Sequence, residues 1–211
     1  MKKIMTIILA SAMMLTLASC ASKKNDDTNT PAPETKPETS IQTENETEAD
    51  NTAEADSAIS VIDTIWSKYA EDEKFPCGGG DSENMNFEGP AAFDITKTDE
   101  LDSTLGLPAS LTENVVDAAS FMHMMNANTF TGACYTLKDG TDAAAFAKTL
   151  KDNILARQWI CGIPETLIII NVDGSHILSA FGASDLIDTL KTNTEAVFDS
   201  ATVIIETAVN E

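Results

Sequence analysis

Basic residues are scarce in this sequence. The 211 residues include 13 Lys and Arg against 34 Asp and Glu, which gives a formal net charge of −21 at pH 7. Proteins that bind nucleic acid need a basic surface to neutralise phosphates, so the composition argues against nucleic acid as a partner. The same acidity opposes adsorption of the chain to an anionic membrane through its own surface.

Motifs that carry catalysis or bind metal ions are also missing. The four cysteines form no Cys-x-x-Cys pair, which removes support for a thioredoxin-like site or a zinc knuckle. The Gly-x-Ser-x-Gly elbow of hydrolases is absent, and the glycines at 78–80 lack the Lys and Ser/Thr of a phosphate loop. The acidic residues 81–88 resemble a calcium loop, but Met85 and Asn86 stand where that loop needs an oxygen ligand and a glycine. We therefore expect no catalytic residues, no cofactor and no metal site, and favour a protein that is not an enzyme.

What the sequence does contain begins with a secretory signal. Lys2 and Lys3 precede an apolar stretch over residues 4–17, and small residues follow it. This is the layout of a signal peptide, and the apolar part is shorter than the about 20 residues that span a bilayer. We predict that residues 1–19 are a signal peptide.

The end of this segment resembles the lipobox of bacterial lipoproteins, with Leu17, Ala18 and Ser19 leading to Cys20. In that family the cysteine thiol receives a diacylglyceryl group and a peptidase cuts before it. The resemblance implies that Cys20 is the lipid attachment residue and that the protein is lipid-anchored at the extracytoplasmic face of the cell membrane. Two acyl chains would hold it there stably. The alternative is an ordinary signal peptide that happens to contain a cysteine.

Residues 21–56 have the composition of a disordered tether. They contain no aromatic residue, one large aliphatic residue (Ile41), and ten acidic against three basic side chains. Such a segment buries too little apolar surface to offset the entropy lost on ordering. We predict that residues 20–56, with the lipidated Cys20, form an acidic spacer between membrane and domain.

Residues 57–211 are expected to form one globular domain with a net charge of −16. Periodicity predicts helices at 57–72, 142–158 and 185–198, and strands at 118–125, 129–137, 166–172 and 175–181. Asp173 and Gly174 predict a type I′ hairpin turn, while residues 202–207 fit either a strand or an extension of the last helix. The predicted class is α+β, with an antiparallel sheet of two β-hairpins, helices packed on one face, and the order α-ββ-α-ββ-α.

Over roughly residues 57–200 the chain resembles the short lipoproteins of clostridia and their relatives that share a domain of unknown function. The resemblance rests on the lipobox, the polar tether and these residues: Met124, Met125, Asn126, Arg157, Pro164, Asp173 and Gly174. The chain departs from the family pattern at 158–163, which is shortened. The resemblance implies a location and a fold class but no activity.

Three cysteines remain once Cys20 is assigned to the lipid. One disulfide and one free thiol would suit an extracytoplasmic protein, and the pairing among Cys77, Cys134 and Cys161 stays open. Cys134 lies within a predicted strand and is expected to be a buried free thiol. Cys77 lies beside three glycines, so we expect it to be more exposed and consider it as a reactive thiol, although no neighbour in sequence would lower its pKa.

The histidines and the single arginine are the other candidates for chemistry. His123 lies between Met122 and Met124–Met125, and thioether with imidazole ligands would suit Cu(I). Alternation along a strand splits these ligands between two faces, which favours packing over a metal site. His176 is expected on the sheet surface. Arg157, at a helix C-terminus where it can meet the last carbonyls of the helix, is expected to form a structural ion pair rather than bind a ligand carboxylate.

Together these features predict a lipid-anchored, non-catalytic binding or interaction module. Its partner would be an envelope protein or a small-molecule ligand of unknown identity. Two alternatives remain: an envelope enzyme that uses a Cys/His pair, and a copper-handling lipoprotein.

Overall fold

The computed structural model describes residues 56–125 and 127–209. The predicted signal peptide, Cys20 and almost all of the predicted tether lie outside the described residues. In chain order the elements are α1 (Ala58–Lys68), β1 (Cys77–Gly78), β2 (Ala91–Phe93), α2 (Thr98–Glu100), the π-helical turn η1 (Leu101–Leu105), α3 (Ala109–Thr112), β3 (Val115–His123), β4 (Phe130–Leu137), α4 (Ala143–Leu155), β5 (Thr166–Asn171), β6 (His176–Gly182), α5 (Ser184–Val197) and β7 (Thr202–Ala208). None of the helices among these residues has the length and apolar character of a membrane span.

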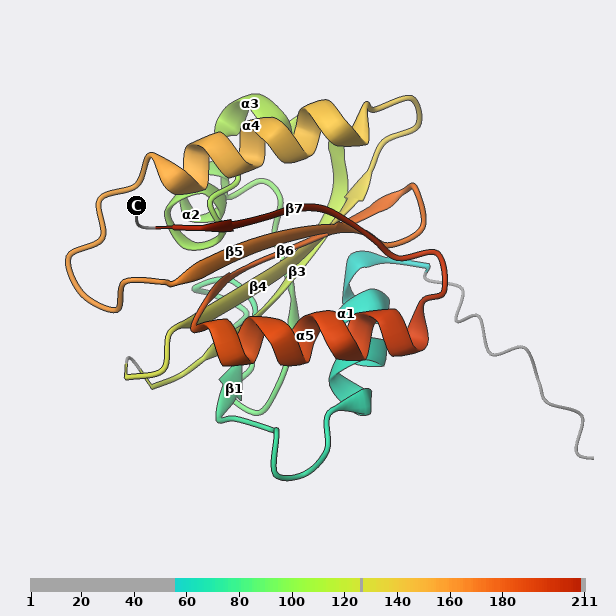
Figure 1. Ribbon diagram of the computed structural model, residues 1–211. Coiled ribbons are helices and arrows are strands. Elements are labelled where there is room, and N and C mark those ends of the chain that lie inside the picture. Colours follow the sequence, from blue (N-terminus) through green and yellow to red (C-terminus); the bar gives the residue numbers. More distant parts are fainter. Residues whose placement is uncertain (1–55, 126, 210–211) are drawn as a thin grey trace, which may run out of the picture. The chain divides into compact units, whose positions relative to one another are not determined.

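One antiparallel sheet organises the molecule (Figure 1). Its strand order is β1-β3-β4-β6-β5-β7, and the short β2 also pairs with β3. Every pairing is antiparallel, so the predicted α+β class with an antiparallel sheet is confirmed. The hairpins β3–β4 and β5–β6 fall at the two positions that the sequence indicates. The order is longer than α-ββ-α-ββ-α, because short elements precede β3 and a strand follows α5.

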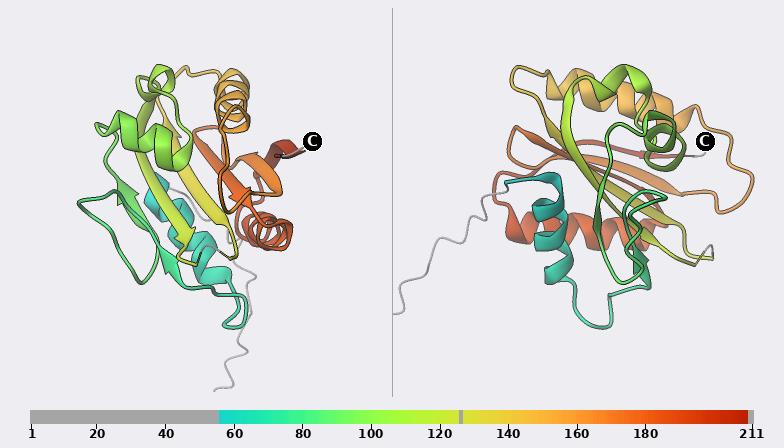
Figure 2. Two further views of the ribbon diagram at one scale, coloured as in Figure 1. Left: turned by 90° about the vertical axis from the view of Figure 1, so that its left-hand side faces the viewer. Right: turned by 180° about the vertical axis from the view of Figure 1, so that it is seen from behind.

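Helices cover both faces of the sheet, which corrects the expectation of one covered face (Figures 1 and 2). Phe121, Cys134 and Leu178 face α1 and α5, whereas Tyr135 and Ile169 face α4 and the segment from η1 to α3. The reason is visible in β5, where four consecutive apolar residues are fully buried. Such a strand is apolar on both sides, and each side must be kept from water.

The glycines at 78–80 serve close backbone packing. A Cβ atom on Gly79 would lie 2.2 Å from the Ser120 carbonyl oxygen and 2.5 Å from the Ala91 nitrogen. Gly80 has φ +95°, in the left-handed region that favours glycine. These glycines let β1 and the following loop press against β3, and Cys77 is thereby buried.

The β5–β6 turn differs from the predicted two-residue type I′ turn. The Val172 N–H donates to the His176 carbonyl, so the turn encloses residues 173–175. The Asp173 carboxylate accepts hydrogen bonds from the N–H groups of Ser175 and His176, and Gly174 has φ +92°. The Asp side chain thus stabilises a longer turn than the Asp-Gly pair alone indicates.

Residues 202–207, left open by the sequence, are part of strand β7. Antiparallel pairing with β5 decides this, since Leu167 lies opposite Thr207 and Ile169 opposite Ile205. α5 ends one residue before Phe198, which is buried in the core beneath it. The chain therefore turns back to the sheet rather than extending the helix.

Candidate functional site

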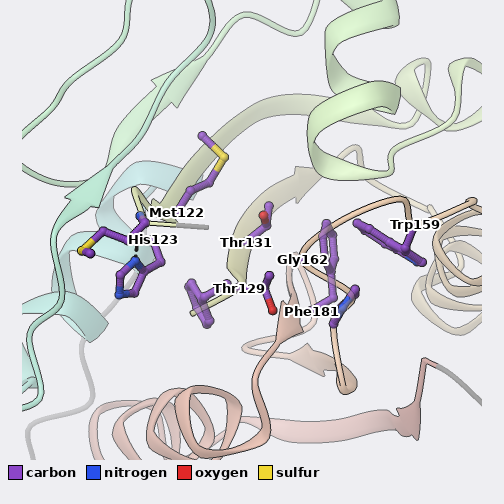
Figure 3. Close-up of a pocket in the computed structure, with 10 residues that line it drawn as sticks. Met122, His123, Thr129, Thr131, Trp159, Gly162 and Phe181 are labelled. Atoms are coloured by element: carbon purple, nitrogen blue, oxygen red, sulfur yellow. Dashed lines mark hydrogen bonds between the residues drawn. The ribbon is translucent and has the colours of Figure 1, made fainter. Parts of the chain in front are cut away.

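A groove of about 220 Å³ lies at one end of the sheet (Figure 3). It is formed by the end of β3, the start of β4, the end of β6 and the segment 156–165 after α4. We call it the sheet-end groove, and its defining residues are Met122, His123, Thr129, Thr131, Trp159, Gly162 and Phe181.

The floor of the groove is a row of side chains across three strands. Met122 lies opposite Thr131 in the β3–β4 pairing, and Thr131 lies opposite Phe181 in the β4–β6 pairing. Directly opposed residues in antiparallel strands point to the same face. α4 ends at Leu155, so this end of the face is bordered by an irregular segment instead of a helix.

Trp159 forms the wall of the groove, and Arg157 holds it in place. The Trp159 and Phe181 ring centroids are 5.4 Å apart. The Arg157 guanidinium lies 4.9 Å from the Trp159 centroid and 5.7 Å from the Phe181 centroid, and it donates a hydrogen bond to the Ser103 carbonyl. These cation–π and hydrogen-bond contacts are internal to the protein. Arg157 therefore has a structural role, as expected, but its partner is a backbone carbonyl on η1 and the two aromatic rings instead of the expected ion pair.

His123 lines the groove, and its neutral imidazole ring can donate a hydrogen bond through Nε2. Its Nδ1 accepts the Met125 N–H at 3.0 Å, and its ring stacks on Phe75 with centroids 5.0 Å apart. Burial lowers the pKa of His123 below its usual 6.5, so the ring is neutral at pH 7. With Nδ1 accepting, the proton resides on Nε2.

This geometry argues against Cu(I) at the methionine–histidine stretch. A metal ligand needs a free nitrogen lone pair, and neutral His123 offers one only at Nδ1, where the Met125 N–H already lies. Met124 lies near Gly78 and does not line the groove, whereas Met122 and Met125 do. Across residues 56–125 and 127–209, no group of three or more His, Cys, Asp and Glu side chains is placed to hold a metal ion.

The groove offers few polar groups, and those present are neutral. The side-chain hydroxyls of Thr129 and Thr131 and the Nε2 of His123 make no hydrogen bond within the part of the chain that the structure describes. No lining residue carries a formal charge at pH 7. The surface is thus chemically suited to a neutral, mostly apolar group with a hydrogen-bonding edge.

The three cysteines within the described residues are free, and their environments oppose thiolate chemistry in two of them. Cys77 is only 4% exposed, so the expectation that it is accessible is wrong. Burial raises the pKa of its thiol to about 12 and raises that of Cys134 well above its ordinary value. A nucleophilic cysteine needs the opposite shift. Cys161 is exposed, in the segment that also carries Trp159.

His176 is buried rather than on the sheet surface, which corrects the sequence expectation. It is 3% exposed, and its Nδ1 lies 2.8 Å from the Asp173 carboxylate. Burial opposes ionisation of Asp173, but hydrogen bonds from His176 and Ser175 outweigh it and lower the Asp173 pKa. His176 is the first residue of β6, and its side chain points to the face covered by α1 and α5, beside Leu178 two residues later. This pair stabilises the turn rather than forming an accessible site.

In the acidic segment 81–88, the first carboxylate, that of Asp81, pairs with Lys97. The buried Asp81 carboxylate accepts from Lys97 Nζ at 2.6 Å and from the N–H groups of Glu83 and Asp94. Burial alone would raise the pKa of Asp81, but these hydrogen bonds outweigh it and hold the pKa well below the usual value. Lys97 also lies 3.3 Å from Glu83. The segment is therefore an internally paired loop.

Comparison with protein-family models, with curated proteins and with solved structures found no match to this chain. The groove itself was not identified from the sequence. Its floor residues come from three strands, and only the strand register brings Met122, Thr131 and Phe181 into one row. Met122, His123 and Met125, which line the groove, were singled out from the sequence, but as metal ligands. Trp159 within an irregular segment was a further signal, because an aromatic residue in a loop often marks a binding surface.

Proposed function

We propose that this chain is a lipid-anchored binding module whose sheet-end groove receives an apolar side chain of a partner protein at the cell envelope. The groove is the observation that carries the proposal. It combines an aromatic wall, an apolar floor and neutral hydrogen-bonding groups in one concave site.

The size of the groove favours a single anchoring side chain. At about 220 Å³ it is smaller than the roughly 300–1,000 Å³ of pockets that enclose a drug-sized ligand. Interfaces often depend on one large side chain that fills a desolvated pocket. A space of this volume accepts such an anchor.

Exposed apolar side chains beside the groove favour a protein over a small molecule. Ile160 is 96% exposed and Ile163 is 53% exposed, and both lie in the segment that supplies Trp159 and Gly162. Met125, which lines the groove, is also exposed. Apolar groups gathered around a concave site extend the contact surface beyond what a small ligand covers.

The predicted lipid anchor at Cys20 supplies the location in the proposal. Diacylation at Cys20 would fix the chain to the outer side of the cell membrane, and residues 21–56 would let the domain reach a partner at a distance of roughly 30–35 Å or more. The lipobox and the resemblance to short lipoproteins with a domain of unknown function support this location. A Cys/His enzyme and a copper site remain as weaker proposals. Cys77 lies opposite His123 in the β1–β3 pairing, but its thiol is buried and burial raises its pKa, which opposes nucleophilic chemistry.

Site-specific photo-crosslinking tests the groove. The photoreactive amino acid p-benzoylphenylalanine is introduced in place of Ile163, and in place of Val116 as a matched control with 52% exposure. Val116 lies near the opposite end of β3, about 20 Å from Met122. We expect crosslinks to a defined envelope protein from position 163 in intact cells, and none from position 116.

A second substitution separates groove binding from nonspecific capture. Trp159→Ala removes the wall, and we expect it to lower the crosslinking yield from position 163 at least tenfold while the domain stays folded by circular dichroism. Equal crosslinking from both positions, or a yield indifferent to Trp159→Ala, would contradict the proposed function.

A further inference from the structure

Strand β7 leaves a long edge of the sheet without a partner strand. It is the last strand in the sheet order and pairs with β5 alone among the described residues. The opposite edge is formed by β1 and β2, which have two and three residues, whereas β7 has seven. Unpaired backbone N–H and C=O groups along such an edge are a template for another strand.

The hydrogen bonds of β7 show which groups point outward. The Val209 N–H donates to the Glu165 carbonyl at 2.9 Å, on the β5 side. Because backbone groups in an antiparallel strand alternate in direction, Thr207 also turns toward β5. Glu206 and Ala208 therefore direct their N–H and C=O groups away from the sheet.

The outer half of β7 has little protection against strand addition. Residues 202–208 contain no proline and no lysine, which are the usual blocking residues of exposed edges. A bulge lies opposite Ile169 and Ile170 and distorts the first half of the strand. From Ile205 onward the register is regular, which leaves a continuous stretch for pairing.

The charges around this edge identify the kind of strand that fits. Glu206 pairs with Lys191 at 2.8 Å, and Asp188 and Glu195 are close enough to Lys191 to add to the electrostatic field around it. On the α5 side, the edge therefore carries three carboxylates for one amine. A second copy of the chain would bring the same carboxylates, in a domain with a net charge of −16, and would be repelled.

We propose that the outer edge of β7 binds an extended basic segment of a partner protein as an additional strand of the sheet. The backbone groups of Glu206 and Ala208 pair with the added strand. Lysine or arginine side chains of that strand meet the carboxylates of Asp188, Glu195 and Glu206. This surface is separate from the sheet-end groove and does not depend on the function proposed for it.

A pair of labelled peptides and a backbone substitution test the proposal on the full-length protein in detergent. The probe is an eight-residue fluorescent peptide that alternates lysine with valine, and its control alternates glutamate with valine. Ala208→Pro removes an outward N–H that no strand among the described residues uses, and edge strands tolerate proline there. Ala208→Ser keeps the N–H and is the matched control.

We expect fluorescence anisotropy to show that the basic peptide binds and the acidic peptide does not. The affinity for the basic peptide should fall at least tenfold in Ala208→Pro and stay unchanged in Ala208→Ser. It should also fall as the salt concentration rises. A double Asp188→Lys, Glu195→Lys variant, which leaves the strand intact, should also weaken binding at least tenfold. Equal binding of both peptides, or binding indifferent to these substitutions, overturns the proposal. Self-association in sedimentation that Ala208→Pro abolishes would assign the edge to a second copy and would also overturn it.

Discussion

At the scale of single residues, burial decides what each cysteine and histidine can do. Cys77 and His176 both lie where the sequence suggested exposure, and both are buried. For Cys77 the strand pairing to β3 supplies the cover, and the loss of water around the thiol raises its pKa to about 12. Neither residue has the accessible, tuned environment that nucleophilic chemistry requires.

Thiol accessibility gives the first prediction. In the folded protein at pH 7.5, we expect a maleimide to modify Cys161 and to leave Cys77 and Cys134 unmodified, because thiolate formation and access are both suppressed by burial. Peptide mass spectrometry measures the sites, and denaturant should expose all three thiols. Rapid labelling of Cys77 in the native protein would show that the pairing of β1 with β3 does not protect its thiol.

The buried carboxylate of Asp81 gives a prediction for acid stability. Its pKa in the folded state lies below its value in the unfolded chain, so the folded state is favoured while Asp81 is ionised. This contribution is complete above the unfolded pKa of about 4 and is lost as the pH falls below it toward the folded pKa.

Urea unfolding between pH 6 and pH 2 measures this effect. We expect the stability of the natural protein to fall more steeply below pH 4 than that of Asp81→Asn, in which the other carboxylates are unchanged. Parallel curves for the two proteins would show that the Asp81–Lys97 pair contributes no pH dependence.

At the scale of elements, close backbone contact explains the run of glycines at 78–80. Among these glycines, Gly79 lets the chain pass close to Ser120 and Ala91, where a Cβ atom would collide with backbone. Residue identity here is dictated by a neighbour about forty positions away in the sequence.

Substitution of Gly79 tests this packing against a matched glycine. Gly79→Ala should destabilise the protein by at least about 1–3 kcal/mol, the cost of forcing atoms into a packed region. Gly89→Ala should change stability little, since a Cβ there would meet only the Asn86 amide nitrogen at 3.7 Å. Denaturant unfolding of the two variants gives the comparison, and equal effects would contradict the proposed role of Gly79.

At the scale of the whole molecule, the arrangement proposed here couples a membrane anchor to a two-sided α+β domain with two candidate contact surfaces. The sheet-end groove and the β7 edge have different chemistry: one is neutral and aromatic, and the other is an open backbone edge flanked by carboxylates. A partner recognised by both surfaces would need an apolar anchor and a basic strand.

The anchor is tested by its own substitution. In cells we expect Cys20→Ser to leave the chain unprocessed and without acyl chains, because the thiol is the proposed acceptor of the diacylglyceryl group. Mass spectrometry of the membrane fraction should show a diacylated amino terminus at Cys20 in the natural protein. Recovery of the natural chain without acyl groups would contradict the proposed lipid attachment at Cys20.

The positions of the long elements could be read from the sequence alone, because hydrophobic periodicity and the Asp173–Gly174 turn are local signals. The sequence also determined the α+β class and the antiparallel hairpins. These features depend on residues that are near one another along the chain.

The face that each helix covers, the strand at residues 202–208 and the place of the groove follow from contacts between distant parts of the chain. The apolar run in β5 carried a signal for two covered faces, but assigning α4 to one and α5 to the other required the sheet. Met122, Thr131, Trp159 and Phe181 meet because strand register and the path of the segment 156–165 bring distant positions together. Contacts of that kind arise from long-range packing, which local propensity does not encode.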